Sequence, residues 1–174
     1  MPLPKTILVP TDFGEPSEAA LDYAIDLARA NGGQIVLLHA YEMPVIGMPD
    51  GALLAAGDIV SRMADGAEIG LDRQLASRGA AGVPLRKMLK QGPPHAMINE
   101  AVEEVGADLV VVGTHGRRGL PRVLLGSVAE KVVRTAKVPV LTVHAGDAAR
   151  PKSADPVWQA SPESNGVSHP PSHR

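Results

Sequence analysis

The sequence predicts a single α/β domain, with a doubly wound parallel sheet of five strands and helices on both faces. Short, continuously apolar segments, which are typical of buried parallel strands, alternate along the chain with longer segments of helical period. Of the 174 residues, 44% are hydrophobic and only 2% are aromatic, so an aliphatic core is expected. A chain of this length is long enough for one domain with a substantial core and too short for two.

The first helix is expected between two apolar strands, at residues 6–10 and 34–41. Between these strands, apolar residues recur at intervals of three and four over residues 20–28, which is the period of a helix with one buried face. Pro16 falls in the first turn of this helix, and Gly32 follows its last turn. Both positions are typical, because proline starts a helix without losing a hydrogen bond and glycine readily ends one.

The middle of the chain is expected to form a loop, a second helix and an edge strand. Residues 42–57 are rich in proline and glycine and predict a long mobile loop, of a length often found in lids. Asp58 is the expected N-cap of the second helix, in which apolar residues recur every four residues over 59–75. Residues 84–91 mix apolar and basic side chains, which favours a less buried strand at one edge of the sheet.

The rest of the domain is expected to contribute two helices and two strands, followed by a tail. In order, these are a helix after Pro93-Pro94, a strand at 108–112, a helix at 128–136 and a strand at 139–144. The domain is therefore expected to span residues 1–146. Over residues 147–174, prolines and polar residues replace aliphatic ones, and such a segment buries too little apolar area to offset its ordering entropy. A disordered tail is expected there.

A basic, glycine-rich loop joins the strand at 108–112 to the helix at 128–136. Glycines let the backbone approach a ligand closely, and arginines at positions 117, 118 and 122 add positive charge with no acid between them. The following helix N-terminus adds unpaired N–H groups and a partial positive charge, so an anion is stabilised there. A nucleotide phosphate is the expected ligand. The loop runs Gly113-Thr114-His115-Gly116-Arg117-Arg118-Gly119 and is followed by Gly126-Ser127.

The spacing of these glycines, Gly-x2-Gly-x9-Gly-Ser, differs from both common phosphate-binding loops, and neither of those occurs in the chain. Together with residues 7–12 and 37–40, the segment 113–143 resembles the ATP-binding branch of the universal stress protein family. The resemblance covers about residues 4–145. It implies a Rossmann-like, adenine nucleotide alpha hydrolase-like sheet in the order 3-2-1-4-5, with a ligand crevice between the first and fourth strands. It also implies ATP, or else ADP or AMP, as the ligand, together with Mg²⁺.

The resemblance further implies which residues form the nucleotide site. Asp12 is expected to meet the ribose or base or to help hold Mg²⁺; the alternatives are an N-cap of the first helix or a partner of a loop arginine. Ser127 is the expected N-cap of the fourth helix whether or not a ligand binds. His115 is expected to shape the loop rather than to act as a general base. The set is Pro10, Asp12 and Ala40 for ribose and base; Gly113, Gly116, Arg117, Arg118, Gly119, Gly126, Ser127, Val128 and Ala129 for the phosphates; and Thr11, Val112, Thr114 and His115 beside them.

The function that the resemblance implies is that of an ATP-binding regulator in a stress response, whose nucleotide state is read by an unknown protein partner. The strand at 139–144 is an apolar edge without guarding charges, so a homodimer is expected to form through it. One alternative is a slow ATPase or phosphotransferase using the same cleft, and another is a chaperone or scaffold independent of nucleotide. No residue is evidently placed to orient a water, so no catalytic residue is assigned and hydrolysis is expected to be weak at most.

Composition argues against several other classes of protein. The net charge of −2 gives no overall case for nucleic-acid binding. No apolar run approaches the ~18 residues of a membrane span, and the first residues lack a secretory segment, so a cytoplasmic protein is expected. The chain has no cysteine, and its six histidines show no metal-ligand spacing, so we expect no disulfide and no metal site made by protein groups alone.

Overall fold

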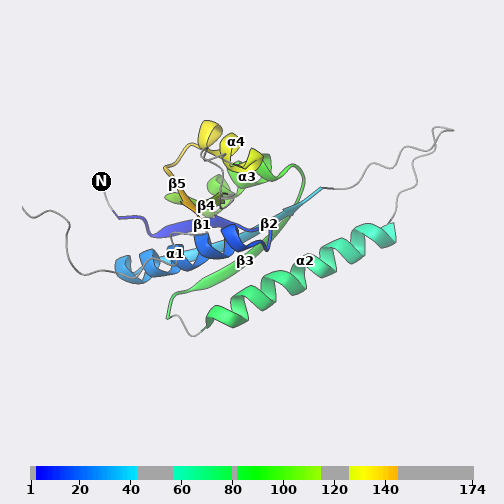
Figure 1. Cartoon of the computed structure of the whole chain (residues 1–174), viewed down its shortest axis with the longest axis horizontal. Helices are drawn as coiled ribbons and strands as arrows, with labels where there is room; N and C mark the ends of the chain where they lie inside the picture. Colours follow the sequence, from blue (N-terminus) through cyan, green and yellow to red (C-terminus); the bar gives the residue numbers. More distant parts are fainter. Residues whose placement is uncertain (1–2, 43–56, 80–81, 115–125, 145–174) are drawn as a thin grey trace, which may run out of the picture.

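The computed structural model describes residues 3–42, 57–79, 82–114 and 126–144 (Figure 1). Most of the expected mobile loop at 42–57 and the whole expected tail at 147–174 lie outside these residues, as does the larger part of the basic glycine loop. The side chains of residues 57–59 are likewise not described. The remaining residues form the α/β unit that the sequence predicts.

Five parallel strands make one sheet in the order β3-β2-β1-β4-β5, which confirms the predicted fold class. The strands are β1 (Thr6–Pro10), β2 (Gln34–Tyr41), β3 (Leu85–Gln91), β4 (Leu109–Thr114) and β5 (Val140–His144). The helices are α1 (Glu15–Asn31), α2 (Gly57–Arg78), α3 (Pro94–Val105) and α4 (Ser127–Thr135). Helices α1 and α2 pack on one face of the sheet, and α3 and α4 pack on the other (Figure 1).

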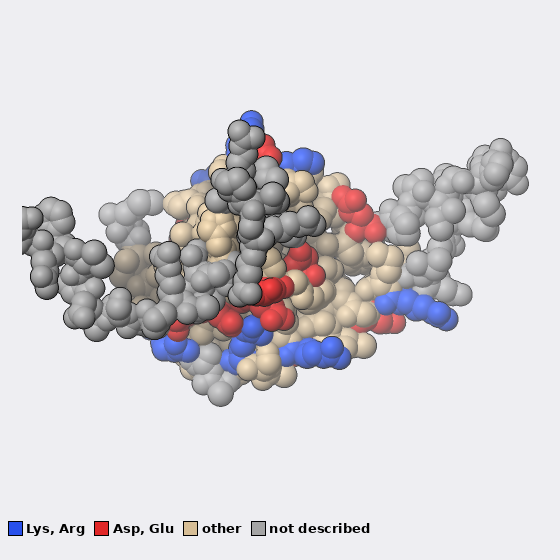
Figure 2. Space-filling view, in the orientation of Figure 1, with Lys and Arg blue, Asp and Glu red and all other residues tan. Residues whose placement is uncertain are grey.

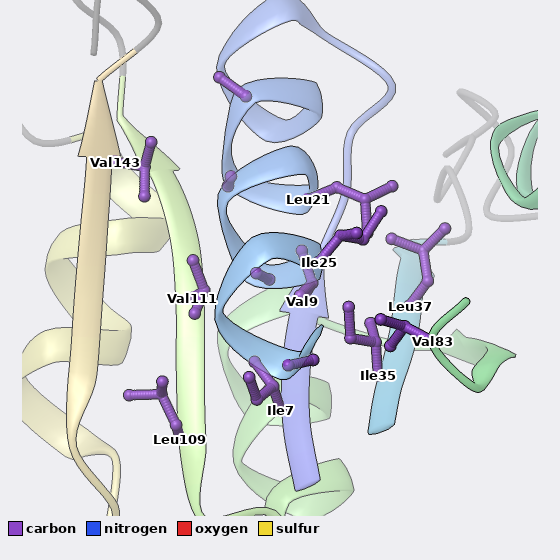
Figure 3. Close-up of a cluster of buried hydrophobic side chains, with 14 of the residues drawn as sticks. Ile7, Val9, Leu21, Ile25, Ile35, Leu37, Val83, Leu109, Val111 and Val143 are labelled. Atoms are coloured by element: carbon purple, nitrogen blue, oxygen red, sulfur yellow. The ribbon is translucent and has the colours of Figure 1, made fainter. Parts of the chain in front are cut away.

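The core lies in two aliphatic layers on either side of the sheet. Side chains alternate across β1, so Ile7 and Val9 face α1 while Leu8 faces α3 and α4. Figure 3 shows the first of these layers, in which Leu21 and Ile25 of α1 lie over the strands. Because both faces are covered, the central strands are continuously apolar, which is why they could be recognised in the sequence.

Helix α1 ends where the sequence predicts, and the two glycines that follow it have different roles. Gly32 is the C-cap with φ of 61°, a left-handed conformation that favours glycine. A Cβ at Gly33 would lie 2.9 Å from the backbone oxygen of Lys5, the residue before β1. The two backbone segments are therefore too close for a side chain at position 33. The pair therefore both stops α1 and starts β2 beside β1.

Several element boundaries differ by a residue or two from the sequence-based expectation, and two of the differences have a clear physical reason. Strand β4 continues through Gly113 and Thr114, because both residues keep their register with Val143 and His144 of β5. Helix α2 begins at Gly57, so the expected N-cap Asp58 lies inside the first turn. An acidic residue is favourable there as well, since the first turn of a helix carries a partial positive charge.

The edge strand β3 is tied to a helix on each face of the sheet. Lys87 contacts Glu68 and Asp72 of α2, both at 2.6 Å. Lys90 contacts Glu100 and Glu104 of α3, also at 2.6 Å. Hydrogen bonds to these carboxylates raise the pKa of both lysines above the ordinary value. Over the described part of the face shown in Figure 2, acidic and basic side chains are accordingly interspersed.

Asp108 joins the start of β4 to the start of β1. Its carboxylate accepts hydrogen bonds from the backbone N–H groups of Lys5 and Thr6, at 2.8 and 2.9 Å. These two bonds, first that from Thr6, lower the pKa of the Asp108 carboxyl below its ordinary value. A lowered folded pKa means that the bonds stabilise the fold fully above the unfolded pKa and cease to do so as pH falls through the folded value.

We therefore predict that Asp108→Asn lowers the melting temperature at neutral pH but not in acid. The amide accepts these two hydrogen bonds more weakly than the carboxylate. Because Asp108 is exposed, we expect the free energy of unfolding to fall by only about 1 kcal/mol, which lowers the melting temperature by roughly 2–4 °C for a domain of this size. Thermal unfolding of both proteins followed by circular dichroism from pH 7 downward measures the difference. An equal difference at every pH would show that the carboxylate charge does not contribute.

Candidate functional site

The described residues form a pocket at the carboxyl edge of the sheet, where β1 and β4 part. These strands pair only at Ile7 with Leu109 and at Leu8 with Val110, whereas β1 pairs with β2 as far as Pro10. Strand order reverses at this point, and in open α/β sheets ligands bind at such a switch point. The pocket encloses about 160 Å³, roughly ten times the ~15 Å³ that one water requires, so it has room for a ligand group.

One end of the pocket is apolar. Its wall combines Leu38 and Ala40 of β2 with Pro94 and Ile98 of α3, and Val112 of β4 lines the pocket from the other side of β1. Ala40 carries only a methyl group, so the strand end does not fill the space beside it. This end can accept a flat apolar or aromatic group.

The other end of the pocket is formed by the start of α4. Gly126, Ser127, Val128 and Ala129 all line it. The predicted N-cap was Ser127, but the N-cap is Gly126, and Ser127 is the first helical residue. Among the described residues, no side chain makes a capping hydrogen bond with the first N–H groups of this helix. An anion is stabilised at such a position by hydrogen bonds and by the helix dipole.

Gly113 also lines the pocket, and the packing of α1 explains why this position holds a glycine. A Cβ at this position would lie 2.2 Å from the backbone oxygen of Pro16 and 2.7 Å from the backbone nitrogen of Ser17. The first turn of α1 therefore packs directly against the backbone of β4. This contact brings Pro16 and Ser17 into the pocket wall.

The turn between β1 and α1 forms the third side of the pocket. Thr11 continues the strand, since its N–H donates to the Leu38 carbonyl at 2.8 Å. Asp12 lies exposed at the pocket rim, and its Oδ1 accepts a hydrogen bond from the Gly14 N–H at 3.0 Å. The N-cap of α1 is Gly14, so the alternative reading of Asp12 as that N-cap is wrong. The carboxylate instead holds the turn, and Asp12 is one of the residues that line the pocket.

Most of the residues proposed for nucleotide binding meet at this pocket, although Thr114 does not. Its side chain is fully buried, and its Oγ1 bonds to the Val143 carbonyl and to His144 Nδ1 of β5. Five further residues of the predicted set lie outside the described residues: His115, Gly116, Arg117, Arg118 and Gly119. Those that line the pocket are Pro10, Thr11, Asp12, Ala40, Val112, Gly113, Gly126, Ser127, Val128 and Ala129.

Sequence reasoning missed Pro16, Ser17, Leu38, Pro94 and Ile98, which also line the pocket. Pro16 and Pro94 carry a usable signal, because each marks a helix start and helix starts gather at the carboxyl edge of a parallel sheet. Leu38 and Ile98 have none, since they look like any other core residue in the sequence.

Within the described residues, no group of three or more His, Cys, Asp or Glu side chains is arranged to hold a metal ion. None of the helices in the same residues combines the length and apolar character needed to cross a membrane.

Comparison with known proteins gives one consistent result. The model of the universal stress protein family matches residues 4–144. Universal stress protein MJ0531 of Methanocaldococcus jannaschii is 34% identical over 141 residues, which are 80% of this chain and 81% of that protein. The solved structure of MJ0577 from the same organism has a TM-score of 0.68 at 27% identity, covering 82% of this chain and 96% of the other. A universal stress protein solved in complex with cAMP has a TM-score of 0.60 at 29% identity, covering 82% and 99%.

The contact at Gly113 yields a stability prediction. Gly113→Ala would force a methyl group into the backbone of α1, which cannot move aside as a flexible side chain could. We expect a loss of about 3 kcal/mol, or roughly 6–12 °C in melting temperature. Gly79→Ala is the matched control, because a Cβ there meets no atom of the described residues within 4 Å. Equal melting temperatures for the two variants would contradict the packing described here.

Proposed function

Because the chain belongs to the universal stress protein family, we propose that its pocket binds an adenine nucleotide, ATP in particular, with Mg²⁺ on the phosphates. The observation that carries this proposal is a switch-point pocket with two unlike ends, one apolar and one at a helix N-terminus. A member of the same family has been solved in complex with cAMP, which is also an adenine nucleotide. The chemistry of each end supports the same ligand.

The apolar end suits the adenine base. A base has two apolar faces and a polar edge, so it needs a narrow apolar slot beside backbone donors and acceptors. Leu38, Ile98 and Val112 provide apolar walls, and Ala40 leaves the space between them open. We assign the ribose to the side of the pocket formed by Pro10 and Asp12, where a carboxylate can accept hydrogen bonds from hydroxyl groups.

The phosphates are assigned to the start of α4. Backbone N–H groups at Ser127, Val128 and Ala129 lie in the first turn, where negative charge is favoured. The Ser127 side chain is exposed at this end and can donate a further hydrogen bond. We include the arginines at 117 and 118 in this part of the proposal because guanidinium groups bind phosphate oxygens with two parallel hydrogen bonds.

The proposal is one of binding rather than rapid turnover. Among the described lining residues, Asp12 is the only one with an ionisable side chain. A carboxylate of this kind can share Mg²⁺ with phosphates, since Mg²⁺ is usually held by one or two carboxylates and the substrate. Fast phosphoryl transfer also needs a group that orients the attacking nucleophile. If Asp12 binds Mg²⁺, it is not available for that role. The nucleotide state would be read by a protein partner.

We expect ATP to bind to the purified protein and Ser127→Ala to weaken that binding about ten- to a hundredfold. The reason is that a hydrogen bond to a charged phosphate contributes roughly 1.5–3 kcal/mol. Isothermal titration calorimetry with ATP and Mg²⁺ measures both affinities. Ser61→Ala is the control, because Ser61 is an exposed serine of α2 outside the pocket lining. Wild-type affinity in the Ser127 variant would remove α4 from the phosphate site.

We also propose a homodimer through the edge of β5. Val140, Leu141 and Thr142 are only partly buried, and β5 has no strand on its outer side within the described sheet. An apolar edge of this kind invites pairing with another strand. Pairing with β5 of a second copy uses one surface on both subunits and closes the assembly about a twofold axis.

For the dimer, the double substitution Val140→Lys with Thr142→Lys should produce monomers, because like charges would face each other across the axis. Light scattering at micromolar concentration measures the mass, and circular dichroism checks that the variant is folded. Ser61→Lys with Ile69→Lys adds the same charge at exposed positions of α2 and should remain dimeric. A monomeric wild type, or a folded β5 variant that still dimerises, would overturn the edge-strand model.

A further inference from the structure

One face of α2, outside the pocket, holds the turn that forms the pocket's third side. Gly70 and Gln74 are four residues apart and so lie one helical turn apart on the same face. Gly70 contacts Phe13, and Gln74 contacts Thr11. Asp12, at the pocket rim, lies between these two anchored residues in the chain.

The first contact depends on the absence of a side chain at Gly70. A Cβ there would lie 2.8 Å from two ring carbons of Phe13, so the ring packs directly on the helix backbone. Phe13 has φ of 62°, an unfavourable conformation for a residue with a side chain, and no other non-glycine residue among those described has a positive φ. Its ring also packs against His39, with ring centroids 4.5 Å apart. The packing on α2 and His39 thus holds the turn in a strained form.

The second contact is a buried polar network. Thr11 Oγ1 donates to Gln74 Oε1 at 3.1 Å, lies 3.1 Å from Ser17 Oγ, and accepts from the Phe13 N–H at 3.0 Å. Ser17 Oγ in turn donates to the Gly14 carbonyl at 2.8 Å. Gln74 is 6% exposed, and its Nε2 has no hydrogen-bond partner among the described residues. Because a buried polar side chain is costly unless it is hydrogen-bonded, the bond to Thr11 fixes how Gln74 is placed against the turn.

Both contacts meet residues that belong to the pocket. Thr11 and Ser17 line it, and the network joins them to each other and to α2. His39 also contacts this turn, because its Nδ1 lies 2.8 Å from the Thr11 carbonyl oxygen. A shift of α2 along or away from the sheet would therefore move Thr11 and Phe13, and with them Asp12.

We propose that Gly70 and Gln74 are positioning residues for the nucleotide pocket, and that α2 is the element through which the pocket is regulated. The inference rests on the proposed nucleotide binding. Whatever changes the position of α2 changes nucleotide affinity, and by reciprocity the nucleotide changes the stability of α2 by the same free energy. We therefore expect the effect of nucleotide binding to be transmitted through α2, although no described residue of this helix lines the pocket.

Gly70→Ala and Gly66→Ala form a matched pair that tests the first contact. Both replace glycine by alanine in the same helix, but a Cβ at Gly66 meets nothing within 4 Å, whereas one at Gly70 meets the Phe13 ring. In ligand-free protein, Gly70→Ala should speed amide hydrogen exchange at Phe13 and Gly14 about tenfold, and Gly66→Ala should not. The ATP affinity of the Gly70 variant should fall about tenfold, a coupling of ordinary size, and Phe13→Leu in the same chain should restore most of it.

Gln74→Met tests the second contact with a side chain of similar length that makes no hydrogen bond to Thr11. ATP should slow hydrogen exchange over residues 70–78 of the wild type, and this slowing should be lost in the variant. If the wild type binds no nucleotide in calorimetry, the proposed function fails, while the ligand-free exchange of the turn still decides the positioning role. If both glycine variants exchange and bind alike, or if ATP slows α2 equally in Gln74→Met, the inference is wrong although nucleotide binding stands.

Discussion

The pocket depends on how closely the first turn of α1 packs against the end of β4. Gly113 leaves no room for a Cβ, which would lie 2.2 Å from the Pro16 carbonyl oxygen. This contact fixes the start of α1 beside the gap between β1 and β4, so the connecting turn must cross the carboxyl edge in a few residues. Within this turn, Phe13 takes a left-handed conformation with φ of 62°. The packing that completes the core therefore also sets the wall of the pocket.

Sequence patterns locate the strands because the sheet is buried on both faces. The predicted bounds of β1 and β2 agree with the structure, since a continuous apolar run ends there at glycine, proline or polar residues. The end of β4 could not be found in this way. Gly113 and Thr114 resemble a loop in sequence, and only pairing with β5, which is remote in the chain, keeps them in the sheet. The start of α4 differs by one residue from the prediction. Gly126 is the N-cap, with φ of −56° and ψ of 150°, so Ser127 is already helical.

The candidate site was predictable where residues carry a local signal. Glycines beside a strand end and a helix start mark Gly113 and the start of α4, and the carboxylate that ends β1 marks Asp12. Thr114 belongs to the same motif, but its buried hydroxyl bonds to Val143 and His144 of β5, and no local pattern in the sequence shows this pairing. Gln74 is some sixty residues from Thr11 and has no motif around it. Its role follows from helix packing, which no local pattern encodes.

The two edges of the sheet are unequal, and this limits how copies of the chain can join. At β3, Lys87 and Lys90 hold carboxylates of α2 and α3 on opposite faces, so an approaching strand would meet fixed charges and two helices. At β5, the edge is apolar and only partly buried. A sheet with two open edges could add copies at both and grow into a fibre. With one edge guarded, the proposed pairing at the other would occupy the only open strand edge of the described sheet, and assembly by strand addition would end at two chains.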